Sequence, residues 1–110
     1  MPKRFGESMD KSGYQIFQQE SPEIAAAFNK LIEAIAKPSA LDPKTKHLIY
    51  IAMKIVTGDQ GAALAHVPLV KKLGASREEL RETVLLTLTV VGLKGINTAL
   101  ASVLETYDKT

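Results

Sequence analysis

The sequence predicts an all-α fold of five to six helices, and three observations carry this prediction. Apolar residues recur every three or four positions along most of the chain, which is the period of a helix with one buried face. Capping residues and glycines divide the chain at intervals of about one helix length. Nothing in the chain resembles the strand-turn-strand pattern of a sheet.

The N-terminal residues 1–19 are predicted to form an arm, with a loosely held start and a short helix over residues 12–19. The first long helix follows this arm. Ser21 supplies a capping acceptor, Pro22 suits the first helical position, and Pro38 stops the helix. Its apolar residues fall on one stripe that we expect to face a core: Ile24, Ala27, Phe28, Leu31, Ile32 and Ile35.

The second helix is predicted between two signals in the sequence. Asp42 and Pro43 repeat the start signal, because an aspartate side chain caps free N–H groups and proline suits the first turn. Gly58 ends the helix, since glycine readily takes the left-handed conformation at a C-terminus. The apolar residues between these signals keep helical spacing: Leu48, Ile49, Ile51, Ala52, Ile55 and Val56.

A third helical stretch is expected from residue 61 to residue 74, and Pro68 interrupts it. Proline offers no N–H to the carbonyl four residues back. We therefore expect a kink, or one short helix followed by another, just after His66. The apolar residues expected to face the core from this stretch are Leu64, Leu69, Val70 and Leu73.

The fourth helix has a strong start signal, because Ser76 and Glu79 form a capping box. Its apolar stripe is formed by Leu80, Val84, Leu88 and Val91. The run 84–91 is apolar on nearly every side, so it needs neighbours on more than one face, and this predicts a subunit interface. Residues 96–107 define a last helix, after which residues 108–110 are expected to fray.

Composition excludes several classes of protein. The formal net charge of +2 gives too weak a positive field to hold a nucleic acid by its phosphates. No stretch approaches the ~20 apolar residues that span a bilayer, and the N-terminus lacks the apolar core of a signal peptide. The absence of cysteine excludes disulfides and thiol redox chemistry. We therefore expect a cytoplasmic protein that binds neither nucleic acid nor membrane, with residues 20–107 as its main domain.

Acid-base chemistry at neutral pH most simply falls to one of the two histidines, His47 and His66. They do not share a metal-binding spacing and no third imidazole exists, so no metal site is predicted. Residues 58–61 form a turn that leads into a helix start before His66, and its N–H groups suit an anionic ligand. The simpler alternatives, a packed histidine and an ordinary helix connection, fit the same residues.

A series of motifs occurs here in an order and spacing typical of one family. The motifs are LDPKTKHLI at 41–49, His66, GASREELRE at 74–82, which begins eight residues after that histidine, Gly92, and NTAL at 97–100. Through them the sequence resembles the carboxymuconolactone decarboxylase family over roughly residues 20–107. The resemblance implies the helical AhpD-like fold, which is shared with an alkyl hydroperoxide reductase component, and a homo-oligomer, a trimer or hexamer, with sites at subunit contacts.

Two branches of that family differ in their chemistry. The branch similar to the alkyl hydroperoxide reductase component uses a Cys-x-x-Cys placed seven and four residues before the histidine. Asp59 and Ala62 stand at those positions here, so thiol peroxidase and disulfide reductase activity are excluded by composition. The cysteine-free branch is the decarboxylase of aromatic degradation, and it acts without a cofactor.

Resemblance to the second branch implies a cofactor-independent lyase that acts on a small carboxylated lactone or a related acid. Loss of CO₂ sends electrons toward the ring carbonyl, so the enzyme needs donors at that oxygen and an acid that protonates carbon. His66 is the implied catalytic residue, in a water-poor cleft where protomers meet. The substrate-binding residues carried over by position are Asp59, Gln60, His47 and Asn97.

An alternative function follows from the apolar surroundings of the histidine. Residues 62–65 are Ala-Ala-Leu-Ala, and a substrate with two carboxylates needs cations, for which the candidates are Lys54, Lys94 or a residue of another subunit. The alternative is a non-catalytic oligomeric module of the same fold that binds a small acid, or nothing, in the corresponding pocket.

Overall fold

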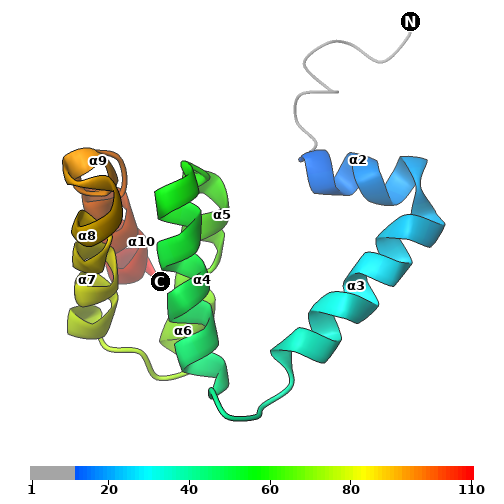
Figure 1. Ribbon diagram of the computed structural model, residues 1–110, viewed down its shortest axis with the longest axis horizontal. Helices are drawn as coiled ribbons and strands as arrows, with labels where there is room; N and C mark the ends of the chain where they lie inside the picture. Colours follow the sequence, from blue (N-terminus) through cyan, green and yellow to red (C-terminus); the bar gives the residue numbers. More distant parts are fainter. Residues whose placement is uncertain (1–11) are drawn as a thin grey trace, which may run out of the picture. The chain divides into compact units, whose positions relative to one another are not determined.

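The computed structural model describes residues 12–110, and every regular element in that range is a helix (Figure 1). Consecutive segments combine into six helices, which confirms the predicted all-α class. The chain divides into two compact units, Met1–Lys37 and Pro38–Thr110, so residues 20–37 of the expected main domain belong to the first unit. Residues 1–11, the expected loose start of the arm, lie outside the described residues. Within residues 12–110 no helix has the length and apolar character needed to cross a bilayer.

The first unit contains α2 (Gly13–Glu20) and α3 (Pro22–Ala36), as predicted. Ser12 caps α2 by accepting a hydrogen bond from the N–H of Gln15. The two helices meet through aromatic side chains, because the ring of Phe17 lies edge-on to the ring of Phe28 at 6.2 Å between centroids. Edge-to-face pairs of this kind are favourable aromatic contacts.

The apolar stripe of α3 does not form the core that the sequence predicts for it. Within this unit α3 buries Ala25, whereas the long apolar side chains of the stripe stay exposed. The exposed members are Ile24, Phe28, Leu31, Ile32 and Ile35. The period is helical as predicted, but one short neighbouring helix is too small to cover such a stripe.

The second unit begins with α4 (Pro43–Thr57), which is bounded by the predicted caps. The Asp42 carboxylate accepts a hydrogen bond of 2.7 Å from the N–H of Thr45. Gly58 ends the helix with a φ of 86°, a left-handed conformation that side chains with a Cβ rarely adopt.

Two short helices, α5 (Gln60–Ala65) and α6 (Val67–Lys72), form the third helical stretch. The break falls at His66, as Pro68 predicts, and the histidine N–H turns back to the carbonyl of Ala63 at 3.2 Å. Val67 and Val70 are buried. The sequence predicts Leu69 and Leu73 in the core, but both are exposed, because Val67 and Val70 on the opposite face of α6 take the core positions.

The fourth helix starts at the predicted capping box but is shorter than its stripe suggests. α7 (Arg77–Leu86) ends at Thr87, and a separate short helix, α8 (Leu88–Val91), follows. The Thr87 hydroxyl donates to the carbonyl of Val84 at 2.6 Å, and the Thr87 N–H bonds the same carbonyl. This local bond tightens the turn and interrupts the α-helical ladder.

The last helical stretch is divided into α9 (Leu93–Gly95), the π-helix η1 (Ile96–Leu100) and α10 (Ala101–Lys109). The expected fraying of residues 108–110 is wrong, because side chains anchor the end of α10. Arg77 binds the Asp108 carboxylate through two hydrogen bonds of 2.8 and 3.2 Å. The Tyr107 hydroxyl donates to the carbonyl of Ala75 at 2.7 Å.

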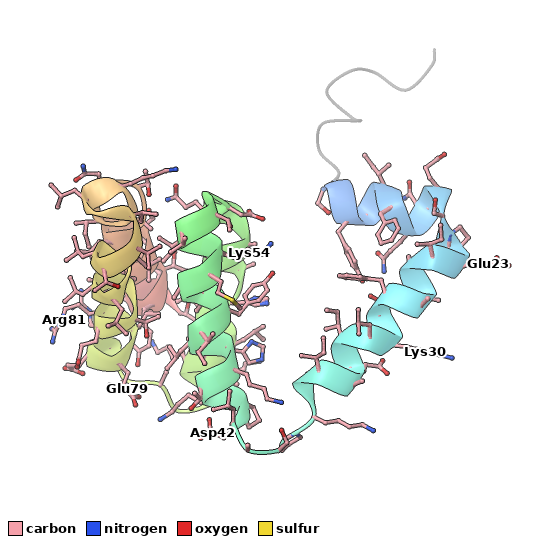
Figure 2. All side chains as sticks on the ribbon, viewed as in Figure 1. Glu23, Lys30, Asp42, Lys54, Glu79 and Arg81 are labelled. Carbon is pink, nitrogen blue, oxygen red and sulfur yellow. The ribbon has the colours of Figure 1, made fainter. Side chains whose placement is uncertain are left out.

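The core of the second unit lies where α4, α5, α6, α7 and α10 converge (Figure 1). It consists of aliphatic residues: Ile51, Ile55, Ala63, Val67, Val70, Ala75, Leu80, Val84, Ala99 and Val103. The ammonium of Lys44, in the first turn of α4, lies 3.1 Å from the Glu79 carboxylate in the first turn of α7. Figure 2 shows Asp42 and Glu79 at the same end of this unit.

We expect Ser76→Ala to lower the free energy of unfolding by about 1 kcal/mol, the usual cost of losing an N-cap. The Ser76 hydroxyl accepts from the N–H of Glu79 at 3.0 Å, and the Glu79 carboxylate accepts from the N–H of Ser76 at 2.8 Å. Urea unfolding would measure the loss. Ser39→Ala, which changes an exposed serine outside the helices, is the matched control. Equal stability of the two variants would contradict the capping argument.

Candidate functional site

His66 occupies the junction between α5 and α6, where one helix ends and the next begins. Its backbone is close to helical, with φ of −89° and ψ of −8°, so the residue ends one helix and begins the next. Its side chain is half-buried against α4. The break caused by Pro68 therefore fixes the place from which the imidazole extends.

One face of α4 surrounds this imidazole. His47, Tyr50 and Lys54 are spaced three and four residues apart, which places them on the same side of the helix. The Tyr50 ring lies 4.2 Å from the His66 ring between centroids, and the His47 ring lies 5.3 Å away. The Lys54 ammonium stands 5.5 Å from the centroid of the Tyr50 ring. We call these four residues the His66 cluster.

The imidazole of His66 carries an unsatisfied polar atom. Its Nδ1 is buried and has no hydrogen-bond partner among the described residues. Burial lowers the pKa of His66 below 6.5, and the nearby His47 and Lys54 lower it further because each disfavours a second positive charge. The ring is therefore neutral at neutral pH, with one nitrogen able to donate and the other able to accept.

Stability should consequently fall as the pH drops below 6.5. The unfolded chain binds a proton at the ordinary pKa of 6.5, whereas folded His66 binds it at a lower pH. The unfolded state then holds more protons, so the free energy of unfolding declines from pH 6.5 down to the lowered pKa and is level below it. Urea unfolding at a series of pH values would measure this decline.

The control for this prediction is His66→Gln, which should flatten the decline. The carboxylates with lowered pKa values, Asp42, Asp59, Glu79 and Asp108, titrate below their ordinary values of 3.8 to 4.5 and affect stability at lower pH. An unchanged decline in the variant would show that another group is responsible.

Asp59 and Gln60 hold the turn between α4 and α5. The Asp59 carboxylate accepts from the N–H of Ala62 at 3.2 Å and pairs with the Lys54 ammonium at 3.3 Å. The N–H of Ala62 and the Lys54 ammonium both lower the pKa of Asp59. The Gln60 amide nitrogen donates to the Ser102 hydroxyl on α10 at 2.7 Å. Asp59 is thus linked to the His66 cluster through Lys54, whereas Gln60 is bonded toward α10.

Asn97 lies apart from the His66 cluster in the described part of the chain. It lies exposed in η1, and no side-chain hydrogen bond joins it to the described residues around His66. Two cavities in the described part also lie elsewhere. One of about 570 Å³ is lined by residues of α4, α7 and α8 and by Thr87, and another of about 280 Å³ lies between α4, α5 and η1. His66 lines neither of them.

Tyr50 is a contact of His66 that the sequence did not single out. The signal was present, because Tyr50 follows His47 by three residues on a helix that was predicted there. What was absent was any indication that this face of α4 meets the α5–α6 junction. Within residues 12–110 no three histidine, aspartate or glutamate side chains are grouped closely enough to hold a metal ion.

The chain is similar to known proteins in both its sequence and its fold. Residues 22–105 match the Carboxymuconolactone decarboxylase family. A solved structure, that of a carboxymuconolactone decarboxylase family protein from Legionella pneumophila in its apo form, is similar with a TM-score of 0.77 and 34% sequence identity. The similarity covers 86% of this chain and 84% of that one. No curated protein sequence matches significantly.

Proposed function

Because the chain belongs to the carboxymuconolactone decarboxylase family, we propose that it is a cytoplasmic, cofactor-independent carboxy-lyase similar to 4-carboxymuconolactone decarboxylase. Its substrate is a small carboxylated lactone or a related acid. The observation that supports this most directly is the buried, unpartnered Nδ1 of His66. An unsatisfied buried polar atom costs roughly 1–3 kcal/mol, a cost that is accounted for if the atom bonds a ligand.

The reaction breaks the bond between a ring-system carbon and the carboxylate. The electron pair of that bond moves toward the lactone carbonyl, CO₂ leaves, and a proton is later added to carbon. A neutral imidazole donates a hydrogen bond to the carbonyl oxygen as negative charge grows there. His66 also relays the proton to carbon: the neutral imidazole gives up the proton of its N–H while its other nitrogen accepts one from a water molecule, and the hydroxide left behind combines with CO₂ as bicarbonate.

Lys54 is the cation of the His66 cluster nearest to this chemistry. Its ammonium is shared between the Asp59 carboxylate at 3.3 Å and the face of Tyr50 at 5.5 Å. An incoming substrate carboxylate competes with Asp59 for that ammonium. His47, whose ring lies 5.3 Å from the His66 ring between centroids, contributes to binding.

We also propose that the working enzyme is a homo-oligomer, a trimer or hexamer, with sites at subunit contacts. Large apolar side chains are exposed on α7, α8 and α9, and contiguous exposed apolar surface is typical of interaction sites. These residues are Leu85, Leu86, Leu88, Val90 and Leu93. His66 lines neither of the two cavities described above, so a neighbouring subunit is needed to enclose its imidazole.

A second candidate function is a non-catalytic oligomeric module that binds a small acid. Two observations favour it: the Ala-Ala-Leu-Ala run next to His66 adds no polar group, and Lys54 is already paired with Asp59. Such a module would keep the fold and the binding of a carboxylate without the proton transfer.

The experiment that tests the proposal is direct. The purified protein is mixed with carboxymuconolactone, and CO₂ release and the ultraviolet spectrum are followed while light scattering reports the size of the oligomer. Multiple turnovers support the lyase. Saturable binding without CO₂ release favours the module, and neither binding nor turnover in a stable oligomer excludes this substrate class.

A further inference from the structure

The cavity of about 280 Å³ is lined partly by polar residues, unlike the aliphatic core of the second unit. It lies between the turn that joins α4 to α5 and the π-helix η1. Its lining is Ile55, Gly58, Gln60, Lys94, Thr98 and Ala99. Small-molecule sites in proteins commonly start at about 300 Å³, so this cavity suits a ligand of only a few carbons. It shares no residue with the His66 cluster.

Lys94 supplies a cation without a counter-charge. Among the described residues its ammonium makes no ion pair, in contrast to the ammonium groups of Lys44 and Lys54, which pair with carboxylates. The other residues that line the cavity are neutral. A lysine without a counter-charge in the lining of a concave site favours a carboxylate, because hydrogen bonds to charged groups are the stronger ones.

The neutral polar groups of the cavity present acceptors. The Thr98 hydroxyl donates its hydrogen to the carbonyl of Lys94 at 2.8 Å, so the lone pairs of its oxygen remain for a donor from outside. The Gln60 amide nitrogen is bonded to Ser102 at 2.7 Å, which leaves the amide oxygen as a second acceptor. A hydroxyl group on the ligand satisfies such acceptors, and the aliphatic wall of Ile55 and Ala99 accommodates a short carbon chain.

The π-helix is an independent indication that this cavity is a functional site. Thr98 and Ala99 line the cavity and both belong to η1, the π-helical segment of the described chain. π-turns inside helices are rare and occur frequently at functional sites. We propose that this cavity is a binding site for a small hydroxycarboxylic acid, with Lys94 on the carboxylate and with Thr98 and Gln60 on the hydroxyl. The site is separate from the decarboxylase site proposed for His66.

The first test is a titration followed by backbone amide NMR shifts, with three probes: β-hydroxybutyrate, butyrate and butanediol. β-Hydroxybutyrate should give saturable shifts at Gly58, Lys94 and Thr98, butyrate should bind more weakly, and butanediol should not bind. Lys94→Gln should weaken β-hydroxybutyrate at least about tenfold, the usual loss for a charge-assisted bond. Lys72→Gln, at an exposed lysine outside the cavity, should bind like the parent.

The second variant tests recognition of the hydroxyl. Thr98→Val keeps the shape of the side chain and should abolish the preference for β-hydroxybutyrate over butyrate while leaving butyrate binding unchanged. The proposal is overturned if Lys94→Gln binds like the parent, if the shifts centre on other residues, or if no probe saturates. The titration measures binding and not turnover. Its interpretation therefore stays the same even if the decarboxylase proposal fails.

Discussion

Gly95→Ala should destabilise the protein by about 2–3 kcal/mol, although alanine is the better helix former by about 1 kcal/mol. Gly95 is buried at the end of α9, and a Cβ placed there would collide with the Thr87 hydroxyl. It would also lie 3.2 Å from Thr87 Cβ and 3.1 Å from Ile55 Cγ2. Thr87 is only 2% exposed and its hydroxyl is bonded to Val84, so rotating it away breaks a buried hydrogen bond.

Gly61→Ala is the matched control for this prediction. Gly61 is also helical, in α5, but a Cβ there meets no atom within 4 Å. The expected change is a gain of roughly 0.5–1 kcal/mol from the smaller backbone entropy loss. Urea unfolding of both variants measures the difference. In a Thr87→Ala background the cost of Gly95→Ala should shrink, and an undiminished cost would show that the clash is not with Thr87.

The helix boundaries that local chemistry controls were predictable from the sequence. Asp42 and Ser76 accept hydrogen bonds from the N–H groups three residues ahead, and Gly58 takes a positive φ, because these preferences belong to the residues themselves. The break at Thr87 and the π-helix after Gly95 were not predictable. Both lie where the segments around Thr87 and Gly95 approach so closely that a Cβ at Gly95 does not fit. One sequence alone does not show that two segments come this close.

The candidate site is likewise predictable from the sequence only in part. The face of α4 that carries His47 and Tyr50 follows from spacing alone, and Pro68 predicts the turn at His66. That the two come together, with ring centroids 4.2 Å apart for Tyr50 and His66, depends on how α4 packs against α5 and α6. Asn97 lies exposed on η1, and among residues 12–110 no side-chain hydrogen bond joins it to this cluster, so its role in binding stays a prediction.

Replacing His66 should separate catalysis from stability. His66→Gln is expected to lower kcat on the lactone by about 10²–10⁴-fold, the usual loss when a positioned acid or base is removed. KM should change little, because the cation and the Tyr50 face remain in place. His47→Gln, at a residue that contacts the imidazole at 5.3 Å between centroids, should mainly raise KM. Steady-state kinetics on the parent and both variants measures the split between kcat and KM.

His66→Phe distinguishes a catalytic role of His66 from a structural one, because the two roles predict different stabilities for this variant. Phenylalanine keeps a ring against Tyr50 but has no nitrogen, so the unpartnered Nδ1 disappears from the buried site. If the imidazole is retained for chemistry, this variant loses turnover yet equals or exceeds the parent in stability at neutral pH by about 1 kcal/mol, because a buried unsatisfied group is costly. A loss of stability together with activity would instead make His66 a packing residue, and undiminished turnover in His66→Gln would remove it from the reaction.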